Sequence, residues 1–160
     1  MVKQNFGDGQ EMPWREPVYK NIAAQQANIS LVENCAKQAG LGLDGFLSNN
    51  SLELYYNIHR DGNSVCYLYK GWADPGFRIG CLIDMKKSHK NFTENLEDFS
   101  KICSKYMLTK TIGNSSMEDC VQVIFETGIY TDGFNGKVLG EAMENMEEAV
   151  AKIRLLLAAD

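Results

Sequence analysis

The segment from Gly133 to Lys137 has the residue types of a phosphate-binding loop. Such a loop reads Gly-x4-Gly-Lys-Ser/Thr, because backbone N–H groups surround the phosphates, the lysine reaches them and the hydroxyl binds magnesium. Here Thr131 stands where the first glycine belongs, and Val138 replaces the hydroxyl residue. The pattern therefore does not predict a phosphate site. A helix N-terminus with Asp132 in its first turn explains the segment better.

The two histidines, His59 and His89, are the natural candidates for acid–base catalysis. A general base needs an orienting partner and a nucleophile within hydrogen-bond reach. His59 stands beside a turn where Asp61 or Ser64 could approach it, but such neighbours are common in hairpins that catalyse nothing. No His-x-x-x-His pair or cluster of His with Asp or Glu indicates a metal site. We therefore predict no catalytic residue, no metal ligand and no cofactor.

The cysteines are widely spaced, odd in number and without a Cys-x-x-Cys pair, which disfavours both a disulfide framework and a zinc site. The first residues lack the apolar stretch of a secretory signal, so we expect a cytoplasmic protein with reduced thiols. In that setting cysteines usually act as small buried hydrophobic residues. The five are Cys35, Cys66, Cys81, Cys103 and Cys120.

Charge and length narrow the classes of partner. The net charge of −5 over 160 residues disfavours nucleic acid, because phosphate binding needs clustered Lys and Arg. The local exception, Lys86 to Lys90, is interpreted as a solvated turn. No apolar run approaches the roughly 20 residues of a membrane-spanning helix.

The length suits one domain, and we expect a flexible N-terminal arm at 1–16 followed by a single domain at 17–160.

Hydrophobic periodicity predicts an α+β fold. Helices are expected over 17–39, 92–107 and 136–158, where apolar residues follow helical spacing. Strands are expected over 52–60, 63–70, 77–84, 109–112 and 120–130. Adjacent strands joined by hairpin turns indicate an antiparallel sheet of four to five strands with helices packed on it, in the order α-β-β-β-α-β-β-α.

The Asp61-Gly62 pair is the strongest hairpin signal in the chain. A two-residue loop there places Ile58 opposite Val65 and Tyr56 opposite Tyr67. In the same register Glu53 lies opposite Lys70 on the other face, which is a favourable pair. We therefore predict that Tyr56 and Tyr67 share one face of the sheet.

The opposite face of the sheet is more apolar than contact with water requires. By the predicted register it carries Tyr55, Cys66, Leu68 and Leu82. One interpretation is that the N-terminal arm or a helix covers these residues. The other is that they bind a partner protein or peptide segment, because an exposed apolar patch usually marks an interaction site.

The last helix is predicted to be part of the core. Counting heptads from Leu139 as position a, every a, d and e position is apolar, which suits a helix lying on a sheet. A coiled-coil dimer through this helix is the alternative. The stripe consists of Leu139, Ala142, Met143, Met146, Ala149, Val150, Ile153, Leu156 and Leu157.

The element order over residues 17–158 resembles that of the class I type III secretion chaperones and of the bacterial sensory-transduction-regulator (YbjN-like) family. The most suggestive part is the strand at 120–130, which leads through a glycine turn into a long final helix. Size, acidity and the lack of catalytic residues are also similar. The resemblance implies a dimeric binding protein that holds an extended partner segment.

Two functions from different classes fit this sequence. The first is a non-enzymatic, homodimeric, protein-binding adaptor or chaperone-like module. The second is a small-molecule-binding protein or unassigned enzyme with a pocket between sheet and helices. A deep pocket with convergent polar groups favours the second, and a flat apolar surface favours the first.

Overall fold

The computed structural model describes residues 5–6, 10–11, 15–47, 53–71 and 73–158. Its helices are α1 (Arg15–Gln38), α2 (Phe92–Tyr106) and α3 (Gly136–Ala158), with a short 3-10 turn η1 (Thr131–Gly133) before α3. Its strands are β1 (Asn5–Phe6), β2 (Gln10–Glu11), β3 (Gly42–Leu47), β4 (Leu54–Arg60), β5 (Asn63–Lys70), β6 (Gly76–Lys86), β7 (Thr109–Asn114) and β8 (Cys120–Tyr130).

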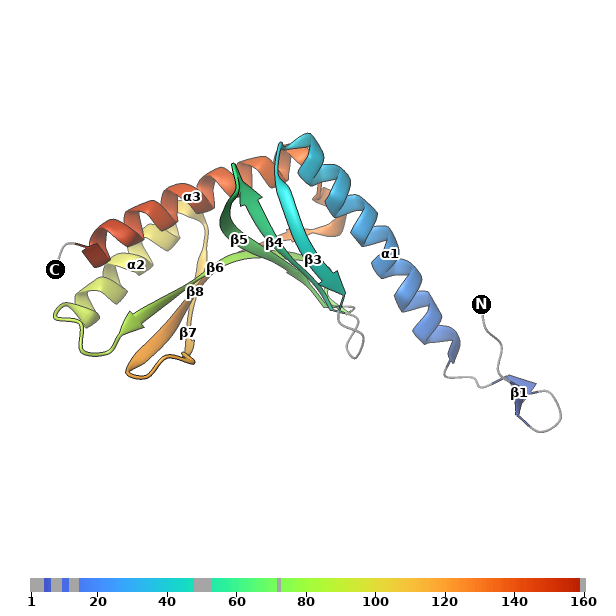
Figure 1. Cartoon of the computed structure of the whole chain (residues 1–160), viewed down its shortest axis with the longest axis horizontal. Helices are drawn as coiled ribbons and strands as arrows, with labels where there is room; N and C mark the ends of the chain where they lie inside the picture. The colour runs from blue at the N-terminus through green and yellow to red at the C-terminus, as the bar shows by residue number, and fades with distance from the viewer. Residues whose placement is uncertain (1–4, 7–9, 12–14, 48–52, 72, 159–160) are drawn as a thin grey trace.

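The α+β class and the antiparallel sheet are confirmed. Six strands form the main sheet in the order β3-β4-β5-β6-β8-β7, and every neighbouring pair is antiparallel. The described helices lie on one side of this sheet, with α3 running across it (Figure 1). The other side, which we call the open face, has no described helix over it.

The predicted number and order of strands were wrong. The sheet has six strands rather than four to five, because β3 follows α1 directly and pairs with β4. Its sequence contains Gly42, Asp44 and Gly45, which are poor strand formers, so no strand was predicted between the helix at 17–39 and the strand at 52–60. Tertiary pairing overrides that weak propensity. Gly45 is also needed, because a Cβ there would overlap the Tyr56 ring.

The predicted arm at 1–16 falls partly outside the described residues, which exclude 1–4, 7–9 and 12–14. Within it, β1 and β2 pair with each other in a separate two-stranded sheet. Helix α1 begins at Arg15, two residues before the predicted start at Pro17. These short elements lie beyond the N-terminal end of α1, away from the main sheet (Figure 1).

The hairpin turn is confirmed, but its predicted register was wrong. Asp61 and Gly62 both have positive φ, 52° and 79°, as a two-residue hairpin loop requires. Arg60 pairs with Asn63, and then a β-bulge shifts the ladder by one residue. A bulge sets two residues of one strand against one of the other, and each one-residue shift moves a side chain to the other face.

Beyond the bulge, the pairs differ from the predicted ones. Ile58 pairs with Cys66, Tyr56 pairs with Leu68, and Tyr67 lies opposite Asn57. Tyr56 and Tyr67 therefore point to opposite faces. The expected pair of Glu53 with Lys70 is also absent, since Lys70 pairs with Leu54.

Helix α3 is part of the core, as predicted. Its buried residues are Gly136, Leu139, Met143, Met146, Ala149, Val150 and Ile153. Leu156 and Leu157 are partly buried against the same core. On the sheet, Phe125 of β8 meets Phe99 of α2 edge to face with ring centroids 5.6 Å apart, a favoured aromatic geometry. Both α2 and α3 therefore contribute side chains to the core between helices and sheet.

All five cysteines are buried and none is in a disulfide. Burial raises the pKa of the Cys35, Cys66, Cys81 and Cys103 thiols above the usual value, which keeps them protonated and unreactive. Cys66 Sγ lies 3.0 Å from Met143 Sδ, between sheet and helix. In the described parts of the chain, no helix has the length and apolarity needed to cross a membrane.

Candidate functional site

The structure divides the predicted binding residues between two faces. Leu82 lies on the open face and is 45% exposed, and Tyr55 lies on the same face. Cys66 and Leu68 instead lie in the core, at 6% and 0% exposure. Their placement was wrong because the bulge after Ser64 turns both side chains toward the helices. Cys66 and Leu68 are therefore buried between sheet and helices and do not form part of the open face.

Tyr67 and Tyr69 lie on the open face, where Cys66 and Leu68 were predicted to lie. The Tyr67 ring stacks with that of Tyr55, with centroids 6.0 Å apart and planes 11° apart. Tyr67 Oη donates a hydrogen bond of 2.7 Å to Glu126. Burial, together with this bond to a carboxylate, raises the pKa of Tyr67 above its usual range, so the phenol stays neutral.

Arg78 connects this tyrosine network to the turn before β6. Its guanidinium donates to Asp74 Oδ2 at 2.8 Å and lies 4.9 Å from the centre of the Tyr69 ring. The hydrogen bond from Arg78 holds the pKa of Asp74 below its usual value. Tyr69 in turn donates to Glu53 at 2.8 Å. On the open face, the rings of Tyr67 and Tyr69 therefore have hydroxyl groups that are already hydrogen-bonded.

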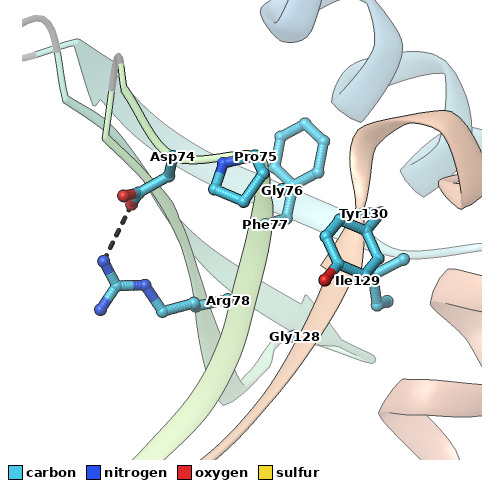
Figure 2. Close-up of a pocket in the computed structure, with 8 residues that line it drawn as sticks. All are labelled: Asp74, Pro75, Gly76, Phe77, Arg78, Gly128, Ile129 and Tyr130. Atoms are coloured by element: carbon cyan, nitrogen blue, oxygen red, sulfur yellow. Dashed lines mark hydrogen bonds and ion pairs between the residues drawn. The ribbon is translucent and has the colours of Figure 1, made fainter.

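A hollow of about 410 Å³ lies at the end of the sheet where β6 begins and β8 ends. Figure 2 shows Pro75, Arg78 and Tyr130 standing around Gly76 and Gly128, which have no side chain. Gly76 pairs with Tyr130 and Arg78 pairs with Gly128 across the two strands, so these four residues share the open face. Gly128 leaves room for a ligand group, because a Cβ there would meet only Phe77 O at 3.9 Å, whereas a Cβ at Gly76 would overlap Ile129 O.

A larger groove of about 720 Å³ adjoins the hollow and shares Arg78, Gly128 and Ile129 with it. It runs between the end of β8, the corner that joins α2 to β7, and the first turns of α3. Fourteen residues line it. They are Arg78, Lys105, Tyr106, Met107, Leu108, Thr109, Glu126, Thr127, Gly128, Ile129, Val138, Glu141, Ala142 and Asn145.

The groove follows a stretch of β8 that has a strand on only one side. β6 pairs with β8 along all of it, from Cys120 to Tyr130, but β7 pairs only as far as Glu126. The reason is Met107, whose left-handed conformation (φ 56°) ends α2 and directs the chain into β7 at Thr109. Because β7 starts there, β8 from Thr127 to Tyr130 has an edge with no described strand paired to it, which we call the free edge.

The direction of the backbone groups on this edge follows from contacts on either side. Thr131 N–H bonds to Pro75 O on the β6 side, whereas Glu126 O accepts from Thr109 Oγ1 on the β7 side. Backbone groups alternate in direction along an antiparallel strand. Gly128 and Tyr130 therefore direct their N–H and C=O groups toward the free edge. Both residues are exposed, Tyr130 at 74%.

The other candidate chemistry remains unsupported. His59 Nε2 lies 2.6 Å from Asp44 Oδ2, a partner that the sequence did not suggest, because β3 was missed. No hydrogen bond in the described region joins His59 to Ser64. No group of three or more His, Cys, Asp or Glu residues among the described ones could hold a metal ion. Before α3, Asn135 Oδ1 accepts from Val138 N–H and caps this helix, while Asp132 lies in the first turn of η1.

Comparison with known proteins gives a match of fold. No protein-family model matches the chain, and no curated protein matches it. A solved structure does match, that of an uncharacterized protein from Methanothermobacter thermautotrophicus, with a TM-score of 0.64 and 12% sequence identity. The match covers 81% of this chain and 95% of that chain. At this identity the likeness shows that the two chains share a fold.

Proposed function

We propose that this chain is a non-enzymatic protein-binding adaptor whose contact surface is the open face of its sheet. The observation that carries the proposal is the absence of any described helix over that face, which carries Tyr55, Tyr67, Tyr69, Tyr130 and the exposed Leu82. Tyrosine is enriched at protein interfaces because it offers a large apolar ring with a polar tip. An exposed apolar patch of this kind usually marks an interaction site.

The alternative, a small-molecule site or active site in the groove, has less support. The groove volume falls in the range of ligand pockets, but its charged groups do not converge on an empty centre. Glu126 accepts from Tyr67, and Glu141 lies 3.9 Å from Lys137. Lys105 lies over the Tyr106 ring. These groups are engaged with neighbours on the protein itself.

The proposal includes self-association as a two-fold dimer, which the resemblance to secretion chaperones implies. A two-fold interface uses the same patch on both subunits, and the open face offers apolar side chains for one. Sedimentation equilibrium at high micromolar concentration measures this directly. A strictly monomeric mass contradicts the dimer and leaves the binding of other proteins to be tested separately.

The test of the adaptor function compares three forms of the full chain as bait in lysate of the source cell. Leu82→Glu places a charge on the open face. Leu155→Glu makes the same change on α3, at a side chain that is 71% exposed. We expect at least one protein to be captured by wild type and by Leu155→Glu but not by Leu82→Glu. That protein should also bind purified wild type directly. Equal capture by all three forms contradicts the proposal.

A further inference from the structure

We infer that the free edge of β8, from Thr127 to Tyr130, binds an extended, uncharged peptide segment of a partner protein by strand addition. A large apolar side chain of that peptide occupies the hollow over Gly128. The inference rests on the proposed protein-binding function and adds the position of the bound segment and its chemistry.

The backbone supplies the first part of the recognition. Gly128 and Tyr130 point their N–H and C=O groups outward, and no described strand pairs with them there. A peptide antiparallel to β8 would continue the line of β7 beyond Thr109. An exposed sheet edge accepts an extended peptide in this way, with main-chain hydrogen bonds giving affinity and side-chain pockets giving specificity.

The hollow supplies the second part of the recognition, a place for one side chain of the peptide. A peptide residue directly opposite Gly128 points its side chain to the same face as Gly128. On that face the hollow is open over Gly128, where a Cβ would meet only Phe77 O at 3.9 Å, and Arg78 and Tyr130 stand at its borders. A large apolar or aromatic side chain therefore fits there. The peptide residues on either side point to the other face of the sheet, toward Val138 and Ala142 in the groove, where small apolar side chains fit.

Charge and size point to a short neutral segment rather than a second copy of the chain. Arg78 bonds to Asp74 at the hollow, and Glu126 accepts from Tyr67. Lys105 lies over the Tyr106 ring. These charges are engaged within the protein, so the site does not favour a charged peptide. Fourteen of the described residues line the groove, whereas a stable protein interface uses roughly 20–30 on each side. The free edge is also bounded, by β7 at one end and by η1 at the other.

The probe is a fluorescein-labelled, N-acetylated pentapeptide with the sequence Ser-Val-Phe-Val-Ser, titrated with the full chain and followed by fluorescence anisotropy. We expect saturable binding that weakens about tenfold or more when alanine replaces phenylalanine, because burying a large apolar side chain is worth at least a factor of ten. N-methylation of the phenylalanine should abolish binding, because that N–H faces the edge of β8. N-methylation of the following valine, whose N–H faces away, should leave binding unchanged.

Matched glycine variants locate the site on the protein. A Cβ at Gly128 would meet only Phe77 O, at an ordinary 3.9 Å, so Gly128→Val is compatible with the fold and places a branched side chain in the hollow where the peptide side chain would lie. Gly113 lies on β7 at a position where a Cβ meets nothing within 4 Å, so Gly113→Val is the control. We expect Gly128→Val to weaken binding of the phenylalanine peptide about tenfold, and Gly113→Val to bind it as wild type does. Equal binding by both variants, or no binding by wild type, overturns the inference.

Two further outcomes separate this inference from the proposed function. If the peptide fails to bind while Leu82→Glu still loses its captured protein, strand addition is wrong and the adaptor function stands. If Gly128→Val reduces the sedimentation mass of the protein, the edge is occupied by a second copy, and the inference of a partner peptide is overturned.

Discussion

Tyr67 on β5 reaches over Gly80 on β6 and donates a 2.7 Å hydrogen bond to Glu126 on β8. The three residues are successive cross-strand neighbours, so the tyrosine ring crosses the middle strand on the open face. A Cβ at position 80 would overlap that ring. Glycine at this one position thus lets a polar bond span three strands.

Removing the Tyr67 hydroxyl should destabilise the protein. Tyr67→Phe deletes the donor and leaves a partly buried Glu126 carboxylate with one hydrogen bond fewer, which typically costs about 1–3 kcal/mol. Tyr130→Phe is the control, because Tyr130 is 74% exposed and should change stability by less than about 0.5 kcal/mol. Urea unfolding measures both. Equal stability of the two variants would show that the Tyr67 bond contributes nothing.

The same bond predicts a loss of stability at alkaline pH. Burial first, and then the bond to Glu126, raise the pKa of Tyr67 in the folded state above the value of about 10 expected when unfolded. The unfolded chain therefore loses this proton first, and the stability present below pH 10 declines as the pH rises above it.

Urea unfolding at pH 9 and pH 11 tests this dependence. The decline between the two values should be smaller in Tyr67→Phe than in wild type. It should not vanish, because the pKa values of Tyr56 and Tyr69 are also raised. An identical decline in both proteins rules Tyr67 out as a source of the pH dependence.

Gly80 and Gly113 should respond oppositely to alanine. At Gly80 a Cβ would displace the Tyr67 ring, break its bond to Glu126 and cost about 1–3 kcal/mol. At Gly113 a Cβ has open space, so alanine should be neutral or stabilise by up to about 1 kcal/mol through its lower unfolded-state entropy. Thermal melts of the two variants distinguish these outcomes. A Gly80→Ala protein as stable as Gly113→Ala would mean that the ring does not cross Gly80.

The elements that sequence reasoning placed correctly are those whose pattern is long. The final helix repeats its apolar stripe over three heptads, and the strand at Cys120–Tyr130 has the bounds expected for it. The Asp61-Gly62 turn was also predictable, because both residues tolerate positive φ. In each case many positions, or one stringent backbone requirement, indicate the same structure.

The candidate site was only half predictable, and the bulge explains why. Up to Ser64 the turn fixes the register, but no residue type marks Val65 as the extra one. One misplaced residue was enough to send Cys66 and Leu68 to the wrong face. The hollow and the free edge depend on how β6, β7 and β8 pair with one another, and the paired residues lie far apart in the sequence. The sequence signal that could have indicated the hollow was the presence of Gly76 and Gly128 in or beside predicted strands. Glycine in a strand often marks a close approach of another backbone or a ligand.

Thiol reactivity tests the packing of the cysteines. All five are buried, and burial raises the pKa of four of them, including Cys66 and Cys103. The folded protein should therefore react slowly with a thiol reagent at pH 8, and all five thiols should react rapidly in concentrated urea. Counting modified thiols by mass spectrometry gives the result. Stoichiometric labelling of the folded protein within seconds would show that these positions open to solvent.

Truncation after Asn145 should leave a chain that is insoluble or unfolded. The deletion removes Met146, Val150 and Ile153, each of which is 6% exposed or less, and burying each such side chain contributes roughly 1.5–3 kcal/mol. It also removes Glu147, which pairs with Arg60 at 2.8 Å. The loss approaches the whole stability of a typical domain, about 5–15 kcal/mol. A control chain that ends at Leu157 keeps these contacts and should melt as the full chain does. Circular dichroism melts decide between the two cases, because a soluble truncated chain with a cooperative transition near the full-length temperature would show that α3 is not needed for the core.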